Sequence, residues 1–186
     1  MFDPASAWTF RLGGGLGYKT PTVFSEDAER LQFRNILPLD MGALKAEESA
    51  GANFDINHRM PLAPGLVMSS NVLFYYTRIA DPLLLIPAGN LFEFTQPDGY
   101  VDTHGAEVNL KWSYGDLKLF VGYTYANVKE HYNGEASDFP LVAKHRLNNV
   151  LMYEKHDNFW IGLEAYYFSP QQLSDGSTGQ AYWITG

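Results

Sequence analysis

The sequence predicts an all-β fold, an antiparallel up-and-down meander of about eight strands. Three observations lead to this prediction. Apolar and polar residues alternate along several segments, these segments are longer than most strands of soluble proteins, and the connections between them alternate between long and short. Because successive side chains of a strand point to opposite faces, alternation predicts a sheet with one apolar and one polar face.

The expected strands span residues 8–19, 47–57, 66–79, 100–114, 117–130, 145–156, 159–168 and 180 onward. The first has the clearest alternation. Its apolar face contains Trp8, Phe10, Leu12, Leu16 and Tyr18. Its other face contains Thr9, Arg11, Gly13, Gly15, Gly17 and Lys19. One face of this strand is therefore expected to be apolar, and the other small or charged.

The later strands repeat this pattern with less regularity. In 47–57, Phe54 and Ile56 alternate with polar residues, and in 100–114, Leu110 and Trp112 do the same. The strand at 117–130 alternates except at Phe120. The last strands are less regular but still strand-like. Alternation does not assign the faces of 66–79, which contains the sequence NVLFYYT.

The connections differ in length in a regular way. The long ones are 20–46, 80–99, 131–144 and 169–179. The short ones are 58–65, Gly115-Asp116 and Asp157-Asn158, and the two dipeptides are typical of tight hairpin turns. Because a meander places alternate connections at opposite ends, one end is expected to have tight turns and the other long loops. Outer-membrane β-barrels have this asymmetry.

Strand length separates two kinds of β-protein. The clearest predicted strands have 11 to 14 residues, whereas soluble strands most often have about 5 or 6 and tilted membrane strands need about 9 to 11. Aromatic residues recur near the strand ends, as in the girdles of membrane barrels. A soluble β-sandwich or lipocalin-like barrel would also alternate. Length, aromatic placement and loop asymmetry together favour part of a larger transmembrane β-barrel.

Composition excludes several other classes. The 13 Lys and Arg residues against 21 Asp and Glu give a net charge of −8, which disfavours a nucleic-acid partner. The absence of Cys excludes disulfides, thiolate metal sites and a Cys nucleophile. The sequence has no run of about 18 apolar residues, so it predicts no transmembrane helix. Met1 is followed by Phe2-Asp3-Pro4, so we expect no signal peptide in this chain.

Five segments, in order, resemble the barrel of TonB-dependent receptors. Residues 11–39 resemble a strand reading R-x-G-x-G-x-G-Y-K followed by a Pro-Thr entry to an extracellular loop. The other four segments are Leu44–Gly51 (LKAEESAG), Asn71–Asp81 (NVLFYYTRIAD), Gly99–Glu107 (GYVDTHGAE) and Pro140–Tyr153 (PLVAKHRLNNVLMY). The resemblance covers nearly the whole chain.

The resemblance implies a bacterial outer-membrane receptor that imports a scarce nutrient, such as an iron chelate, corrinoid or glycan, with TonB-transduced energy. Such receptors hold a plug domain inside a barrel of about 22 strands. We therefore expect residues 1–186 to be an interior slice of the barrel domain, without plug domain, signal peptide or C-terminal strands. The implied partners are outer-membrane lipid, the plug domain, the TonB complex and a small-molecule nutrient. We expect neither enzymatic activity nor a cofactor.

Charged residues on the polar face are the first candidate site. The residues expected to face the lumen are Arg11, Lys19, Glu107, Lys111, Arg146 and Glu164. They could pair with plug groups, solvate the channel or contact substrate, because the inner lining of such barrels sets selectivity. The alternative for each residue is pairing within the barrel wall.

Aromatic and charged residues of the long loops are the second candidate site, since such loops suit ligand recognition. Loop 20–46 contributes Phe24, Arg30, Phe33 and Arg34, and loop 131–144 contributes His131 and Tyr132. The sequence does not identify the ligand that these loops would bind.

Catalytic and metal sites are not expected. The His residues are scattered, and no motif for a nucleophile elbow or phosphate loop is present. Glu47-Glu48, or the carboxylates around Asp98 and Asp102, could act as acid–base carboxylates or as cation ligands, but solvated charges are the plainer interpretation. We interpret the glycines of 13–17 as thinning a strand. Two other functions stay open: a passive pore or small structural barrel, and a soluble β-domain that binds carbohydrate or lipid.

Overall fold

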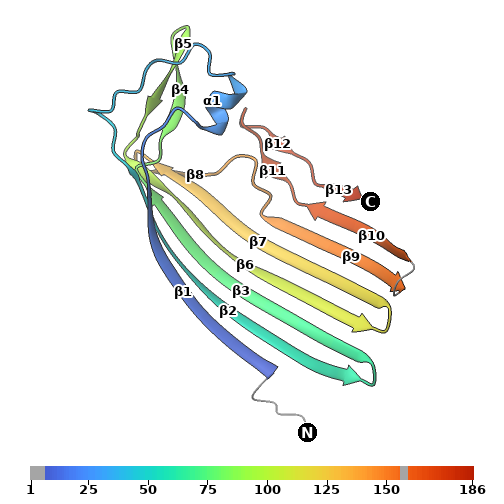
Figure 1. The fold of residues 1–186 in the computed structure, drawn as a ribbon. Helices are drawn as coiled ribbons and strands as arrows, with labels where there is room; N and C mark the ends of the chain where they lie inside the picture. The colour runs from blue at the N-terminus through green and yellow to red at the C-terminus, as the bar shows by residue number, and fades with distance from the viewer. Residues whose placement is uncertain (1–6, 156–158) are drawn as a thin grey trace.

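The computed structural model describes residues 7–155 and 159–186 and shows one large, curved, antiparallel sheet (Figure 1). Its strands are β1 (Trp8–Lys19), β2 (Glu47–Ala63), β3 (Leu66–Ala80), β6 (Gly99–Tyr114), β7 (Leu117–Tyr132), β8 (Glu135–Asp138), β9 (His145–Lys155), β10 (Phe159–Phe168) and β13 (Tyr182–Thr185). The order across the sheet is β1-β2-β3-β6-β7-β9-β10-β13, and β8 pairs with β7. The predicted all-β meander is confirmed, and the sheet is an open section of a barrel.

The short connections lie at one end of the sheet. Gly115 has a φ of +54° and forms the predicted tight turn with Asp116. The connection predicted at 58–65 is wrong in extent, because β2 and β3 pair as far as Ala63 and Leu66, with a bulge near Pro61. Only Pro64-Gly65 remains as the turn, and Gly65 has a φ of +77°. The predicted turn at 157–158 lies outside the described residues.

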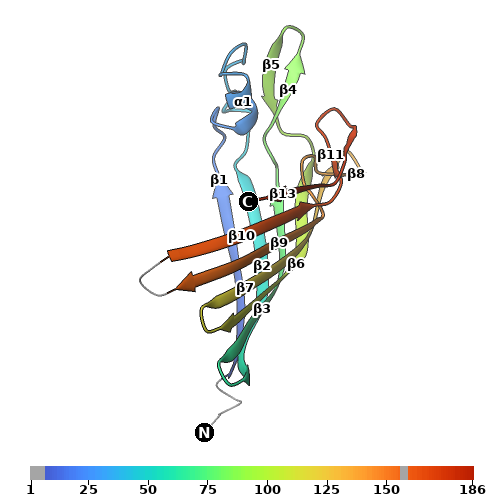
Figure 2. The same cartoon turned by 90° about the vertical axis from the view of Figure 1, so that its right-hand side faces the viewer.

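The long connections contain secondary structure of their own at the opposite end. The segment 20–46 contains the helix α1 (Glu26–Arg30), which Ser25 caps, and 80–99 contains the hairpin of β4 (Leu84–Ala88) and β5 (Leu91–Thr95). A backbone bridge from Ile36 to Phe92 joins the segment 20–46 to this hairpin. Figure 2 shows α1 and the hairpin rising from the same end of the sheet. The last long connection holds the short pair β11 (Gln171–Gln172) and β12 (Thr178–Gly179).

The segment 131–144 differs from the prediction. We expected His131 and Tyr132 in a loop, but β7 continues to Tyr132 and then pairs with β8. The prediction was wrong because Tyr100 and Gly99 of β6 extend the ladder to the end of β7. Hairpin pairing of this kind depends on the neighbouring strand and leaves no clear signal in the local sequence.

The register assigns every long strand's faces, because directly opposed residues share a face. One row across six strands of the apolar face contains Phe10, Ile56, Val72, Val108, Tyr123 and Leu147. Leu12 and Leu16 on this face are 82% and 89% exposed. Within the described residues, the only buried hydrophobic residues are Ala28, Ala126 and Ala143. The apolar face is therefore not the inside of a protein core.

No helix among the described residues has the length and apolar character to cross a membrane.

Candidate functional site on the polar face of the sheet

The register brings all six predicted charged residues onto the polar face. Arg11, Glu107 and Arg146 even fall in one cross-strand row, although they come from β1, β6 and β9. Lys111 and Glu164 share another row, and Lys19 lies at the loop end of β1. Their predicted contacts with a plug, channel water or substrate stay predictions.

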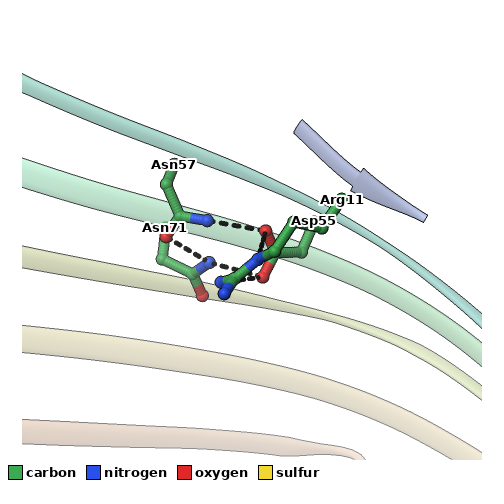
Figure 3. A network of polar contacts seen from close by, with 4 residues as sticks. All are labelled: Arg11, Asp55, Asn57 and Asn71. Atoms are coloured by element: carbon green, nitrogen blue, oxygen red, sulfur yellow. Dashed lines mark hydrogen bonds and ion pairs between the residues drawn. The ribbon is translucent and has the colours of Figure 1, made fainter. Parts of the chain in front are cut away.

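Arg11 is held by a network of polar side chains from β1, β2 and β3 (Figure 3). Its Nε and Nη2 donate to the two carboxylate oxygens of Asp55, at 3.0 and 2.7 Å. Asn57 Nδ2 donates to Asp55 Oδ1 at 2.6 Å, and Asn71 Nδ2 donates to Asn57 Oδ1 at 3.0 Å. A bidentate pair of this kind fixes orientation as well as charge. Arg11 is thus paired within the wall, as the alternative interpretation expected.

An asparagine row crosses the polar face next to this network. It contains Asn57, Asn71, Asn109 and Asn148, with Gly122 between the last two. A Cβ on Gly122 would lie only 3.0 Å from Asn109 Oδ1, so the glycine leaves room for the amides. Sequence reasoning missed this row, because each strand contributes isolated asparagines that only the register brings together.

The asparagine row lines a groove of about 280 Å³. Ser69, Lys111 and Phe120 also line it. Lys111 Nζ lies 5.1 Å from the centre of the Phe120 ring, which accounts for an aromatic residue on the polar face. Side-chain amides offer both donors and acceptors. The groove can therefore hydrogen-bond to a polypeptide or to a polar solute.

Two of the six predicted charges make no ion pair, side-chain hydrogen bond or cation–π contact within the described residues. These are Glu107 and Arg146, which have no opposite charge within 4.0 Å. Arg146 Nε is buried and, among the described residues, lacks a hydrogen-bond partner. By contrast, Lys19 Nζ lies 3.2 Å from Glu47, and Glu164 accepts a hydrogen bond from Tyr166 at 2.5 Å.

A glycine on the polar face makes room for a side chain of the neighbouring strand. Gly105 of β6 lies opposite Tyr75 of β3 and Ala126 of β7. A Cβ there would lie 2.5 Å from the Tyr75 hydroxyl oxygen and would also collide with the Tyr125 carbonyl oxygen. The glycine is therefore required for the Tyr75 ring to lie across β6.

The predicted loop residues do not form a single site. Phe24 and Phe33 pack edge to face, with ring centres 5.8 Å apart, and Arg30 lies 3.7 Å from Asp27 beside them. Arg34 follows α1, where its backbone N–H donates to Leu31. On β7, His131 falls on the apolar face and Tyr132 on the polar face. Ligand binding by these residues stays a prediction.

A second cavity lies among the loops and was not predicted. Its volume is about 330 Å³, and it lies between the segments 138–144 and 170–178. Its lining includes Asp138 and Lys144, which form an ion pair of 2.7 Å. Next to it, hydrogen bonds from Ser177 hold the pKa of Asp175 below its usual value. The cavity can accept a polar solute at the loop end of the sheet.

The acid–base pair considered at Glu47-Glu48 is not formed, and the glycines of 13–17 belong to a strand as expected. Glu47 pairs with Lys19 on the polar face, whereas Glu48 lies opposite Tyr18 on the other face, so the two carboxylates cannot act on one substrate. The glycines of 13–17 lie within β1, where no helix N-terminus can bind phosphate. Within residues 7–155 and 159–186, no group of His, Asp and Glu is arranged to hold a metal.

An exposed apolar face, a polar opposite face and tight turns at one end define the wall of a transmembrane β-barrel. A family model described as TonB dependent receptor-like, beta-barrel matches residues 1–186. The chain therefore belongs to this family, whose members reside in the bacterial outer membrane.

Solved structures of three transporters and receptors have the same fold. The FrpB iron transporter from Neisseria meningitidis (F3-3 variant) matches with a TM-score of 0.69 at 17% identity, over 99% of this chain and 30% of that one. The copper transporter OprC matches with a TM-score of 0.69 at 15% identity, over 96% of this chain and 28% of that one. The ferric-catecholate import receptor Fiu from E. coli K12 matches with a TM-score of 0.64 at 14% identity, over 97% of this chain and 26% of that one. A search of curated proteins finds no match.

These comparisons settle several predictions. The family, the outer-membrane location and the barrel fold are confirmed, and the family and its structural neighbours are receptors and transporters, not enzymes. The soluble β-domain is excluded by the family match. The chain spans about 30% of the length of the FrpB structure that it matches.

Proposed function

We propose that the protein containing this chain binds a scarce nutrient at its outer face and imports it with TonB-transduced energy. The chain would supply part of the wall and several outer loops. The observation that carries this proposal is the polar face, which continues across all the long strands and holds Glu107 and Arg146 without ion partners among the described residues. A plug domain elsewhere in the parent protein would contact this face, as the family implies.

An iron or other metal chelate is the nutrient class that we favour over a corrinoid or glycan. Three structural neighbours are described as an iron transporter, a copper transporter and a ferric-catecholate receptor. The loop cavity with its ion pair of Asp138 and Lys144 offers both charges to a polar chelate. The asparagine row would then contact the solute or the plug along the import path.

Uptake in cells tests this proposal directly. Cells producing the intact protein as their only such receptor are given a radiolabelled ferric catecholate, in strains with and without TonB. The proposal expects saturable accumulation that is lost without TonB. Uptake that does not saturate and continues without TonB would contradict it and favour a passive pore. TonB-dependent accumulation of a labelled corrinoid or glycan, with none of the ferric catecholate, would change the nutrient class.

A further inference from the structure

A group of polar residues interrupts the apolar face near the loop end of β3, β6 and β7. We call it the outer charged patch, and it consists of Arg78, Tyr100, Asp102, Lys129 and His131. Arg78, Asp102 and Lys129 are directly opposed across the three strands, and Tyr100 is opposed to His131 one row further out. They share the face of Val72 and Val108, so in the intact barrel the patch faces the lipid.

Charge on the apolar face is restricted to its ends. In the seven long strands of the described chain, the ionised residues on this face are Glu48, Arg78, Asp102 and Lys129 at the loop end, and Lys155 at the turn end. The row just below the patch contains Tyr76 with the polar residues His104 and Asn127, and the next row contains Tyr125. Tyrosines and polar side chains at this depth fit the interface between the hydrocarbon and the headgroups. The patch therefore lies at the level of the outer-leaflet headgroups.

The side chains of the patch hold one another in place. The Arg78 guanidinium carbon lies 3.6 Å from the centre of the Tyr100 ring, which in turn stacks on His131 with centres 4.3 Å apart. His131 Nε2 lies 2.6 Å from Asp102 Oδ1, so the carboxylate is engaged by the histidine. Stacking on tyrosine leaves the edge of a guanidinium free to donate hydrogen bonds.

Two cations of the patch form no ion pair with a described residue, although Asp102 lies between them in the ladder. Within the described residues, neither Arg78 nor Lys129 has a carboxylate oxygen within 4.0 Å. Asp138 is opposed to Lys129 in the ladder, but its carboxylate lies 2.7 Å from Lys144 instead. Two strand spacings, about 10 Å, separate the backbones of Arg78 and Lys129. The pair can therefore bind two anionic groups of one ligand.

An apolar groove begins beside Arg78 on the same side of the sheet. It has a volume of about 580 Å³, and its lining includes Leu16, Tyr18, Ala50 and Ala80. Glu48 also lines it, and this carboxylate opposes an anionic ligand. Small alanine side chains between larger ones give the groove its depth. An alkyl chain fits these walls, with its charged end beside Arg78.

We propose that the patch and groove bind a lipid of the outer leaflet that carries two phosphate groups. Arg78 and Lys129 would each bind one phosphate, and an acyl chain would lie in the groove. Ligands that reach this face of a membrane barrel are lipids, and basic residues at headgroup level favour anionic ones. Arginine matches the oxygens of a phosphate with two donors. This inference rests on the membrane location and does not depend on the proposed import function.

Lipid binding to the purified intact protein tests this inference. Native mass spectrometry in a non-ionic detergent is used to measure binding of bisphosphorylated lipid A and of its fully dephosphorylated form. The double variant Arg78→Ala with Lys129→Ala is expected to weaken binding of the phosphorylated lipid at least tenfold, given about fivefold for each cation. Glu48→Gln is expected to strengthen it. Lys155→Ala, at the other end of the same face, is the matched control and is expected to change nothing.

Three results would overturn the inference. One is equal binding of the phosphorylated and dephosphorylated lipids, and another is unchanged affinity in the double variant. The third is displacement of the lipid by an equal concentration of inorganic phosphate, which would show a free-anion site. The heat-dependent gel mobility of each variant establishes that its barrel is folded, so loss of binding cannot be attributed to misfolding.

Discussion

The two faces of the sheet share the same strands and register, but different surroundings stabilise them. Large side chains of the apolar face, such as Leu12 and Leu16, are left uncovered by the protein. On the polar face, Arg11, Asp55 and Asn57 satisfy one another through hydrogen bonds. The comparison shows that the apolar face relies on the bilayer to cover its side chains, whereas much of the polar face is stabilised by contacts among its own side chains.

The polar face is itself divided. Over β1, β2 and β3 the charges of Arg11 and Lys19 meet carboxylates of the neighbouring strand. Over β6 and β9, Glu107 and Arg146 have no such partner among the described residues. In the first part these charges are met by the wall alone. In the second part Lys118 and Glu154 pair near the turn end, whereas Glu107 and Arg146 are offered to another domain or a solute.

The largest effect is expected from a charge on the lipid side. Val108→Arg on the apolar face, midway between the outer charged patch and the turn end of β6, should destabilise the intact protein by about 2–4 kcal/mol, the cost of arginine near the membrane midplane. Urea unfolding in lipid vesicles, followed by tryptophan fluorescence, measures this. Asn109→Arg is the matched control because the neighbouring side chain points to the polar face. Equal losses for the two variants would contradict the assignment of faces.

A smaller loss is expected where a glycine of the polar face makes room for a tyrosine ring. Gly105→Ala should cost about 1–3 kcal/mol, the usual range for overpacking, because the new methyl group would meet Tyr75 and the Tyr125 carbonyl oxygen. Gly15→Ala is the control, since no atom lies within 4 Å of its Cβ position. The same unfolding assay compares the two. Equal stability of both variants would refute the close packing at Gly105.

Breaking the Arg11 network should lower stability less. Asp55→Asn removes the charge that pairs with Arg11 and is expected to lower the urea midpoint by less than Gly105→Ala does. A double-mutant cycle with Arg11→Met measures the coupling between the two side chains. The loss in the double variant should be smaller than the sum of the single losses. Strict additivity would mean that the pair contributes nothing to the wall.

The smallest change in stability is expected at Arg146. Arg146→Met should stay within about 0.5 kcal/mol of the native protein, because its side chain has no ion pair to lose among the described residues. If the proposed import function holds, uptake should nevertheless fall several-fold. Arg11→Met should show the opposite balance, with stability reduced more than uptake. A clear loss of stability in Arg146→Met would contradict the distinction between paired charges over β1, β2 and β3 and unpaired charges over β6 and β9.

The sequence predicts the fold where alternation is strong and local. In β1 each apolar residue from Trp8 to Tyr18 falls on one parity, so both faces could be assigned. In β3, Leu73 and Phe74, like Tyr75 and Tyr76, are apolar or aromatic on both parities. Only the pairing of Phe74 with Phe54 of β2 shows which residues of β3 lie on the apolar face. Local patterns are thus sufficient for strands with contrasting faces.

The candidate site depended on register, which is a long-range property. Arg11 and Asp55 are 44 positions apart, and no local pattern links them. The asparagine row needs five strands in the correct alignment, since β7 with Gly122 lies between β6 and β9. His131 was misplaced because the end of β7 is fixed by its partners in β6 and β8. The individual inner charges could be named from sequence, but their neighbours could not.

At the end of the sheet with the tight turns, the number of residues in each turn is critical. One residue added between Gly115 and Asp116 would shift β7 by one position against β6, and each of its side chains would then point to the wrong side. A similar insertion in the segment 20–46 would be absorbed without disturbing any long strand. Insertions and deletions in evolution should therefore accumulate in the large connections, while the hairpin bends keep a constant number of residues.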